Sequence, residues 1–244
     1  MIKKWLVILL IGMGIGNIVA WFSGSAPIEF EKIAYSGRDD KQLNFLHARL
    51  DENKSDTASM LQLGQLYSQH NEIGKAAGLL GRAYRKEPDN MLIKAAFYSN
   101  EGKLAGAMFD PLMGIYKLYR LRHAMGQVDA AALEANSDFS VRLIRLLTFA
   151  YVGPIGGFFH RVFEDEAWFN ALISETPKAI SMEAKQLIYI ALANAYLIKE
   201  REDSADMATA SNYYQKAMVL ARCPYILQAS CKELTQRFVA LDGN

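Results

Sequence analysis

The chain has little of what most specialised sites require. Its 244 residues include 2 cysteines, too few for a disulfide-rich framework or a cysteine-rich metal site. With 6 prolines and 17 glycines it is neither collagen-like nor of low complexity. It also lacks an excess of charge of either sign, since 27 Lys plus Arg and 26 Asp plus Glu give a net charge of +1. This balance argues against nucleic-acid binding.

The sequence also lacks the common motifs of catalysis and metal binding. The four histidines, His47, His70, His123 and His160, stand alone, without HExxH, HxH or CxxC spacing. The segment 153–157 (GPIGG) lacks the Lys and Ser or Thr of a phosphate loop, so we expect a tight turn between helices there. No G-x-S-x-G elbow is present. We therefore expect a protein that is not an enzyme and that carries no metal and no cofactor.

An acidic cluster lies at 164–166, close to His160. His160 and Glu164 lie one turn apart on a predicted helix and could share a metal ion, but a polar helix start is the simpler explanation. The trio Glu164, Asp165 and Glu166 is likewise expected to be a solvated first turn.

A long apolar run follows two lysines at the N-terminus. After Lys3 and Lys4, the segment Trp5 to Phe22 (WLVILLIGMGIGNIVAWF) has 18 residues without a charge. As a helix it would span roughly 27 Å, close to the hydrocarbon thickness of a bilayer. The next residues, 23–31 (SGSAPIEFE), contain no Lys or Arg, so the positive-inside rule places the rest outside the cytoplasm. We expect a single-pass inner-membrane anchor over 1–26 and a body over 27–244, in the periplasm of a Gram-negative source.

Two alternatives concern this anchor. Ser23, Gly24 and Ser25 are small residues at a spacing that signal peptidase reads, so cleavage after Ser25 would leave a soluble or secreted body. Gly12 and Gly16 form a GxxxG pair, which would allow two anchor helices to approach closely and self-associate.

From Asp39 onward the apolar residues follow the 3.6-residue period of a helix, so we expect an all-α body. The clearest unit covers 57–90 and contains, in order, Met60, Leu63-Gly64, Tyr67, Ala76, Leu80, Ala83 and Pro88. This spacing resembles the tetratricopeptide repeat (TPR) family, in which about 34 residues form an antiparallel helix pair. The resemblance implies helix hairpins stacked as a short TPR-like solenoid.

The residues of this unit also have a physical interpretation of their own. Gly64 and Ala76 are small where the two helices would cross closely, and Tyr67 and Leu80 would fill the space around them. Pro88 would end the second helix.

The rest of the body matches the repeat more loosely. A second, degraded unit at 186–222 has an insertion between Lys199 and Asp206. We also expect an antiparallel pair at 141–152 and 158–173, a helix at 112–126 and a short helix at 129–136. The small and aromatic residues of the second unit are Leu192, Ala193, Tyr196, Ala210, Tyr214 and Ala217.

A terminal helix should close the stack. We expect it to begin near Pro224 and to carry one apolar stripe. Cys223 and Cys231 would then lie roughly 12 Å apart, beyond the reach of a disulfide, so two free thiols are predicted. The stripe consists of Leu227, Cys231, Leu234, Phe238 and Leu241.

The resemblance implies that a ligand lies in a concave groove lined by the first helix of each repeat. In the 57–90 unit the lining positions are Leu61, Gln65, Ser68 and Gln69. They differ from the Lys and Asn pattern of the TPR carboxylate clamp, so an acidic chaperone tail is not the expected partner.

A second candidate surface is cationic. Lys117, Arg120 and His123 recur every three residues on one helix face, which we expect to be solvated. The alternative is a docking patch for an acidic partner or anionic lipid.

These patterns favour a membrane-anchored extracytoplasmic TPR-like scaffold that binds a protein or peptide. The alternative is a helical small-ligand-binding accessory protein of a transport system, with a pocket lined by aromatic residues. The aromatic residues for that pocket would be Phe158, Phe159, Trp168 and Phe169.

Overall fold

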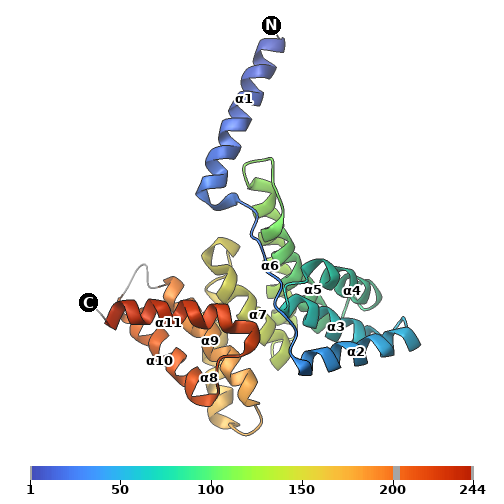
Figure 1. The fold of residues 1–244 in the computed structure, drawn as a ribbon, viewed down its shortest axis with the longest axis vertical. Helices are drawn as coiled ribbons and strands as arrows, with labels where there is room; N and C mark the ends of the chain where they lie inside the picture. Colours follow the sequence, from blue (N-terminus) through green and yellow to red (C-terminus); the bar gives the residue numbers. More distant parts are fainter. Residues whose placement is uncertain (1, 200–203, 243–244) are drawn as a thin grey trace.

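The computed structural model describes residues 2–199 and 204–242, and the described residues form helices without strands. Figure 1 shows α1 projecting from a body formed by the remaining helices. Short helical turns occur at Trp21–Ser25, Gly153–Gly156 and Tyr225–Leu227. The helices are α1 (Ile2–Ala20), α2 (Gly37–Glu52), α3 (Thr57–Gln69), α4 (Ile73–Lys86), α5 (Met91–Ala107), α6 (Ile115–Glu134), α7 (Phe139–Val152), α8 (Arg161–Glu175), α9 (Met182–Lys199), α10 (Ser204–Leu220) and α11 (Gln228–Asp242).

Polar caps determine where several helices begin. Ser36 and Asp39 form a capping box at the start of α2. The side chains of Asp56, Asn90 and Asp138 accept backbone N–H bonds at the starts of α3, α5 and α7. Each cap satisfies backbone amides of the first turn that have no partner within the helix, so each of these helices begins next to its cap residue.

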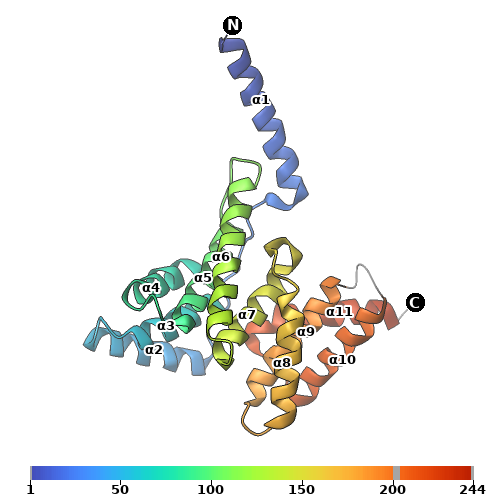
Figure 2. The same ribbon diagram turned by 180° about the vertical axis from the view of Figure 1, so that it is seen from behind.

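The helices pack in chain order. Each helix from α2 to α9 packs on the next one, and α3, α5, α7, α9 and α11 also pack on one another in sequence. Figures 1 and 2 show α2 to α5 on one side of the body, α8 to α11 on the other, and α6 and α7 between them. The all-α prediction is therefore confirmed, with helices stacked against their neighbours along the chain.

The α3–α4 hairpin is the predicted unit at 57–90. A Cβ atom on Gly64 would lie 2.6 Å from Leu80 Cγ, which confirms the close helix approach predicted at that glycine. Tyr67, Ala76 and Leu80 are buried in the same core. Asn71, with φ 60°, forms the turn between the helices, and α4 ends at Lys86, before Pro88.

Two further predicted pairs are helical. Helices α7 and α8 are joined by a turn in which Gly153 and Gly157 have φ of 69° and 84°, conformations that favour glycine. This geometry confirms the tight turn expected at 153–157. Helices α9 and α10 form the second unit, and residues 200–203 of its predicted insertion lie outside the described residues.

The prediction of two helices at 112–126 and 129–136 is wrong, because α6 is one helix that begins at Ile115 and ends at Glu134. Gly126 does not break it. That glycine faces the Phe158 ring, and Val128, two residues later, is fully buried in the core. Packing on both sides of the glycine therefore outweighs its low helix propensity.

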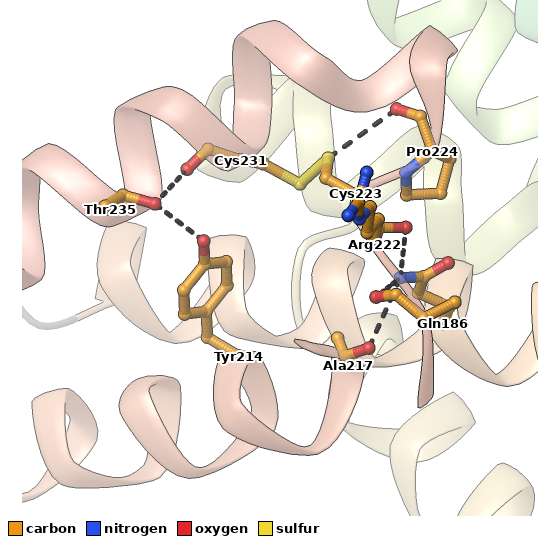
Figure 3. Close-up of a disulfide and its surroundings, with 9 residues drawn as sticks. Gln186, Tyr214, Ala217, Arg222, Cys223, Pro224, Cys231 and Thr235 are labelled. Carbon is orange, nitrogen blue, oxygen red and sulfur yellow. Dashed lines mark hydrogen bonds between the residues drawn. A yellow bond between two sulfur atoms is a disulfide. The ribbon is translucent and has the colours of Figure 1, made fainter. Parts of the chain in front are cut away.

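The prediction of two free thiols is also wrong. Cys223 and Cys231 form a disulfide with a Cα–Cα distance of 6.4 Å (Figure 3). Pro224 has ψ of 142°, so the chain is extended there and folds back through a short turn. Helix α11 consequently begins at Gln228, later than Pro224, and the straight helix that would separate the sulfurs does not form.

The apolar stripe of the last helix faces the core. Cys231 and Leu234 are buried there, and Leu227 and Phe238 pack against the same cluster. The side chain of Leu241 lies outside the described residues. Buried Gln186 donates to the carbonyls of Ala217, Ala221 and Arg222, which satisfies the end of α10 beside the disulfide (Figure 3).

Two apolar stretches in the described residues bear on the membrane prediction. Phe139–Gly156 is long and apolar enough to cross a bilayer, and Leu10–Ala20 is a shorter apolar stretch. The first includes α7, which packs against α5, α6, α8 and α9, as expected of a core helix in the body. The second lies in projecting α1, where described side chains such as Ile11, Ile15 and Val19 are more than half exposed.

Candidate partner-binding face

A row of polar side chains crosses α3, α5 and α7. Lys103 Nζ on α5 donates to the Ser68 carbonyl oxygen on α3 at 2.7 Å. Ser99, one turn from Lys103, shares a hydrogen bond of 2.7 Å with Thr148 on α7. Tyr151 lies one turn further along α7. We call the row Ser68, Ser99, Lys103, Thr148 and Tyr151, together with the accessible Gln65 and Gln69 beside Ser68 on α3, the odd-helix face.

The row continues toward the C-terminal helices. Asn194 on α9 donates to the Ala150 carbonyl oxygen on α7 at 2.8 Å, beside Tyr151 on the same helix. The Tyr151 side chain is 42% exposed, yet desolvation by the surrounding protein raises the pKa of its hydroxyl.

Lys103 gives this face a positive charge. Burial lowers the pKa of its ammonium to about 8. Its neighbours are the Ser68 carbonyl, Asn71 Oδ1 at 3.4 Å and the Phe30 ring at 6.0 Å. Among the described residues Lys103 makes no ion pair with a carboxylate, so an acidic group from a partner would meet an uncompensated charge.

The groove residues predicted on α3 differ in their burial. Leu61 is 8% exposed and packs in the core with Leu46 and Met60, so it is not available to a partner. Gln65 and Ser68 are half-buried and Gln69 is exposed. Of the four predicted residues, these three remain accessible.

The prediction that the cationic stripe is solvated is wrong for its first member, Lys117. Lys117 is 9% exposed, and its Nζ donates to the carbonyl oxygens of Ser25 and Ala26, at 2.8 Å for Ala26. Arg120 is paired with Glu101 at 2.6 Å. The helical period could not show that the segment after α1 folds back onto Lys117.

The segment between α1 and α2 also lies on this surface, although no motif in its sequence indicates this. Its residues 27–35 are extended and cross the C-terminal ends of α5 and α3 (Figure 1). Ile28 N–H donates to the Gly106 carbonyl at 2.9 Å, and Ile33 N–H donates to the His70 carbonyl at 3.1 Å. The helical array therefore binds an extended peptide of its own chain by main-chain hydrogen bonds.

The most buried charges lie away from this face. Arg145 on α7, 1% exposed, binds Asp165 on α8 at 2.7 Å and Asp129 on α6 at 2.9 Å. Arg142 adds a bond of 3.0 Å to Asp165. Asp165 is thus not part of a solvated first turn, as predicted, but of a buried network that joins three helices.

The aromatic residues of the alternative ligand pocket pack against the C-terminal core. Phe169 is fully buried, Trp168 contacts its edge, and Phe158 stacks on Phe149. A hollow of about 270 Å³ lies elsewhere, where Asn17, Trp21 and Phe22 face Phe109. Among the described residues no group of three His, Cys, Asp or Glu side chains could hold a metal ion.

Comparison with protein-family models, curated proteins and solved structures finds no match to this chain.

Proposed function

We propose that the chain is a membrane-anchored, extracytoplasmic TPR-like scaffold that binds a protein or peptide on the odd-helix face. The observation that carries this proposal is the continuous polar row across α3, α5 and α7. In a TPR-like array the first helices of successive repeats line the concave side, and α3, α5, α7, α9 and α11 pack in that order. The proposed act is binding, without catalysis.

The anchoring part rests on α1. Large apolar side chains on it, such as Ile11, Ile15 and Val19, are more than half exposed. Lys3 and Lys4 lie in its first turn, and residues 23–31 carry no basic residue. A reporter that works only outside the cytoplasm, fused after Asn244, should therefore be active. Activity of a cytoplasm-only reporter instead would contradict the extracytoplasmic location of the body. The mass of the mature protein distinguishes an anchored chain from one cleaved after Ser25.

The partner chemistry follows from the face itself. The main-chain hydrogen bonds that hold the chain's own segment 27–35 at the ends of α3 and α5 support a partner that is an extended peptide. Polar Gln65 and Gln69 offer amide donors and acceptors to a peptide backbone, and Lys103 suits an acidic side chain. We therefore propose an extended peptide with at least one acidic residue.

Substitution on α3 tests this function. Gln65→Ala together with Gln69→Ala should reduce the amount of protein recovered after crosslinking in intact cells, while the melting temperature stays near that of the parent chain. Gln215→Ala, an exposed glutamine on α10, is the matched control and should leave recovery unchanged. Equal loss from both variants, or none from either, would contradict a site on this face.

A further inference from the structure

A cluster of large apolar side chains is exposed where α5 connects to α6. Its members lie between residues 109 and 119, and we call this segment the α6 tip. In Figures 1 and 2 the tip points toward the same end of the molecule as α1. The exposed fractions are 63% for Phe109, 47% for Leu112, 41% for Met113, 63% for Ile115, 47% for Tyr116 and 67% for Tyr119.

The tip is held in one conformation by specific contacts. The Asp110 carboxylate accepts hydrogen bonds from the backbone N–H groups of Leu112 and Lys117 at 2.8 and 2.9 Å. Met113 has φ of 56°, a conformation that costs energy for a side chain other than glycine, and Gly114 follows with φ of 81°. The chain thus bends sharply at a fixed place and presents apolar side chains outward.

The tip is fastened alongside α1. Asn17 donates from its amide to the Pro111 carbonyl at 2.6 Å and accepts from the Met113 N–H at 2.8 Å. Met113 also packs on Gly16, where a Cβ atom would collide with its sulfur. Gly16 therefore serves this contact, whereas self-association through Gly12 and Gly16 stays a prediction.

This attachment determines how deep the tip would lie in a bilayer. Asn17 precedes Phe22, the last residue of the apolar run, by five positions, which is about 7.5 Å along a helix. If α1 crosses the membrane as proposed, residues bonded to Asn17 lie below the outer end of the apolar run. They therefore lie about 7.5 Å inside the outer end of the run, on the acyl-chain side of the boundary between headgroups and acyl chains.

The composition of the tip suits that boundary. Tyr116, Tyr119 and the neighbouring Trp21 combine an apolar ring with a polar atom, the side-chain type enriched at membrane interfaces. Asp110, the acidic residue of segment 109–119, has its carboxylate bound to backbone amides. The Asn17 amide, which would be costly in lipid, is likewise satisfied by the tip.

We propose that the α6 tip inserts into the outer interface of the same bilayer that α1 crosses, so that the body is held at the membrane by two attachments. This inference rests on the proposed anchoring by α1. The occupant is lipid rather than a second copy of the chain, because Asn17 fixes the tip beside the apolar run. The body could then not rotate freely about the anchor, and its orientation on the membrane would be set.

Fluorescence quenching in vesicles tests the proposal. The full-length protein, with its native cysteines in the disulfide, is given a single new cysteine by Ile115→Cys and labelled with an environment-sensitive fluorophore. Vesicles of phosphatidylethanolamine and phosphatidylglycerol carry a spin-label quencher near the headgroup end of the acyl chains. Matched variants are Ile15→Cys on exposed α1 and Val219→Cys, 87% exposed on α10. Melting curves confirm that each variant folds.

The Ile115 and Ile15 labels should both lose emission to the lipid quencher, while the Val219 label should lose emission only to iodide in the water. An Ile115 label that behaves like the Val219 label, with the Ile15 label still quenched by lipid, would contradict insertion of the tip but not anchoring by α1. An Ile115 label protected from both quenchers would also contradict insertion and indicate a protein contact. An Ile15 label untouched by the lipid quencher would overturn the anchor and the tip together.

Discussion

At the scale of single residues, one carboxylate fastens the extended segment 27–35 to the α3–α4 hairpin. Glu72 accepts a hydrogen bond from Tyr35 at 2.5 Å and pairs with Lys75 at 2.6 Å and Lys32 at 3.3 Å. Burial opposes ionisation of Glu72, but these contacts outweigh it and lower the pKa from 4.5 to about 2. The ionised carboxylate is therefore favoured in the folded state.

This pKa predicts acid sensitivity. Because the folded-state pKa is lowered, the stabilisation by Glu72 is fully present above pH 4.5 and is lost as the pH falls toward 2. Both lysines are largely exposed, so screening limits the effect to about 1 to 2 kcal/mol. Urea unfolding at several pH values should show Glu72→Gln destabilised at pH 7 and nearly equal to the parent at pH 2. A constant difference across this range would contradict the assignment.

The buried carboxylate of Asp165 should contribute strongly to stability. Asp165→Ala leaves Arg145 buried without its main partner and should lower the free energy of unfolding by about 3 to 5 kcal/mol. Glu164→Ala removes the adjacent, half-exposed carboxylate paired with Arg161 and should cost about 0.5 kcal/mol. Chemical denaturation measures both. A comparable loss of unfolding free energy for the two variants would contradict a larger contribution from the buried network.

At the scale of elements, the helix hairpin depends on one close approach. Gly64→Ala should destabilise the body by about 1 to 3 kcal/mol, because the new methyl group meets buried Leu80. Gly78→Ala on α4 has open space around it and should stabilise by up to about 1 kcal/mol through helix propensity. Thermal melts that shift in the same direction for both variants would rule out the close contact.

The hairpins were predictable because their signals are local. Gly64, Ala76 and Pro88 act within one helix pair, and Gly153 and Gly157 act within one turn. The continuation of α6 through Gly126 was not predictable, because the packing that favours it comes from Phe158 and other distant residues. The disulfide is not predictable for a related reason, because the bend of the chain after Pro224 that brings the two cysteines together has no local sequence signal.

Across the whole protein, the packing of each helix on its chain neighbours could be expected from helical periodicity and short turns, but the surface could not. Lys117 and Asp165 look solvent-facing along their own helices, yet each binds a segment far away in the chain. The extended segment 27–35 and the α6 tip have no motif at all. Their roles depend on which distant segments meet, and helical periodicity carries no information on that.

Photo-crosslinking in intact cells tests whether a partner binds the odd-helix face. A photoreactive residue replaces Gln69 on α3 in one variant and Gln215 on α10 in the other, since both glutamines are exposed. We expect one discrete crosslinked species from position 69 that is lost when Lys103→Met is added, and none from position 215. Equal crosslinking from both positions, or none from position 69, would contradict binding to this face.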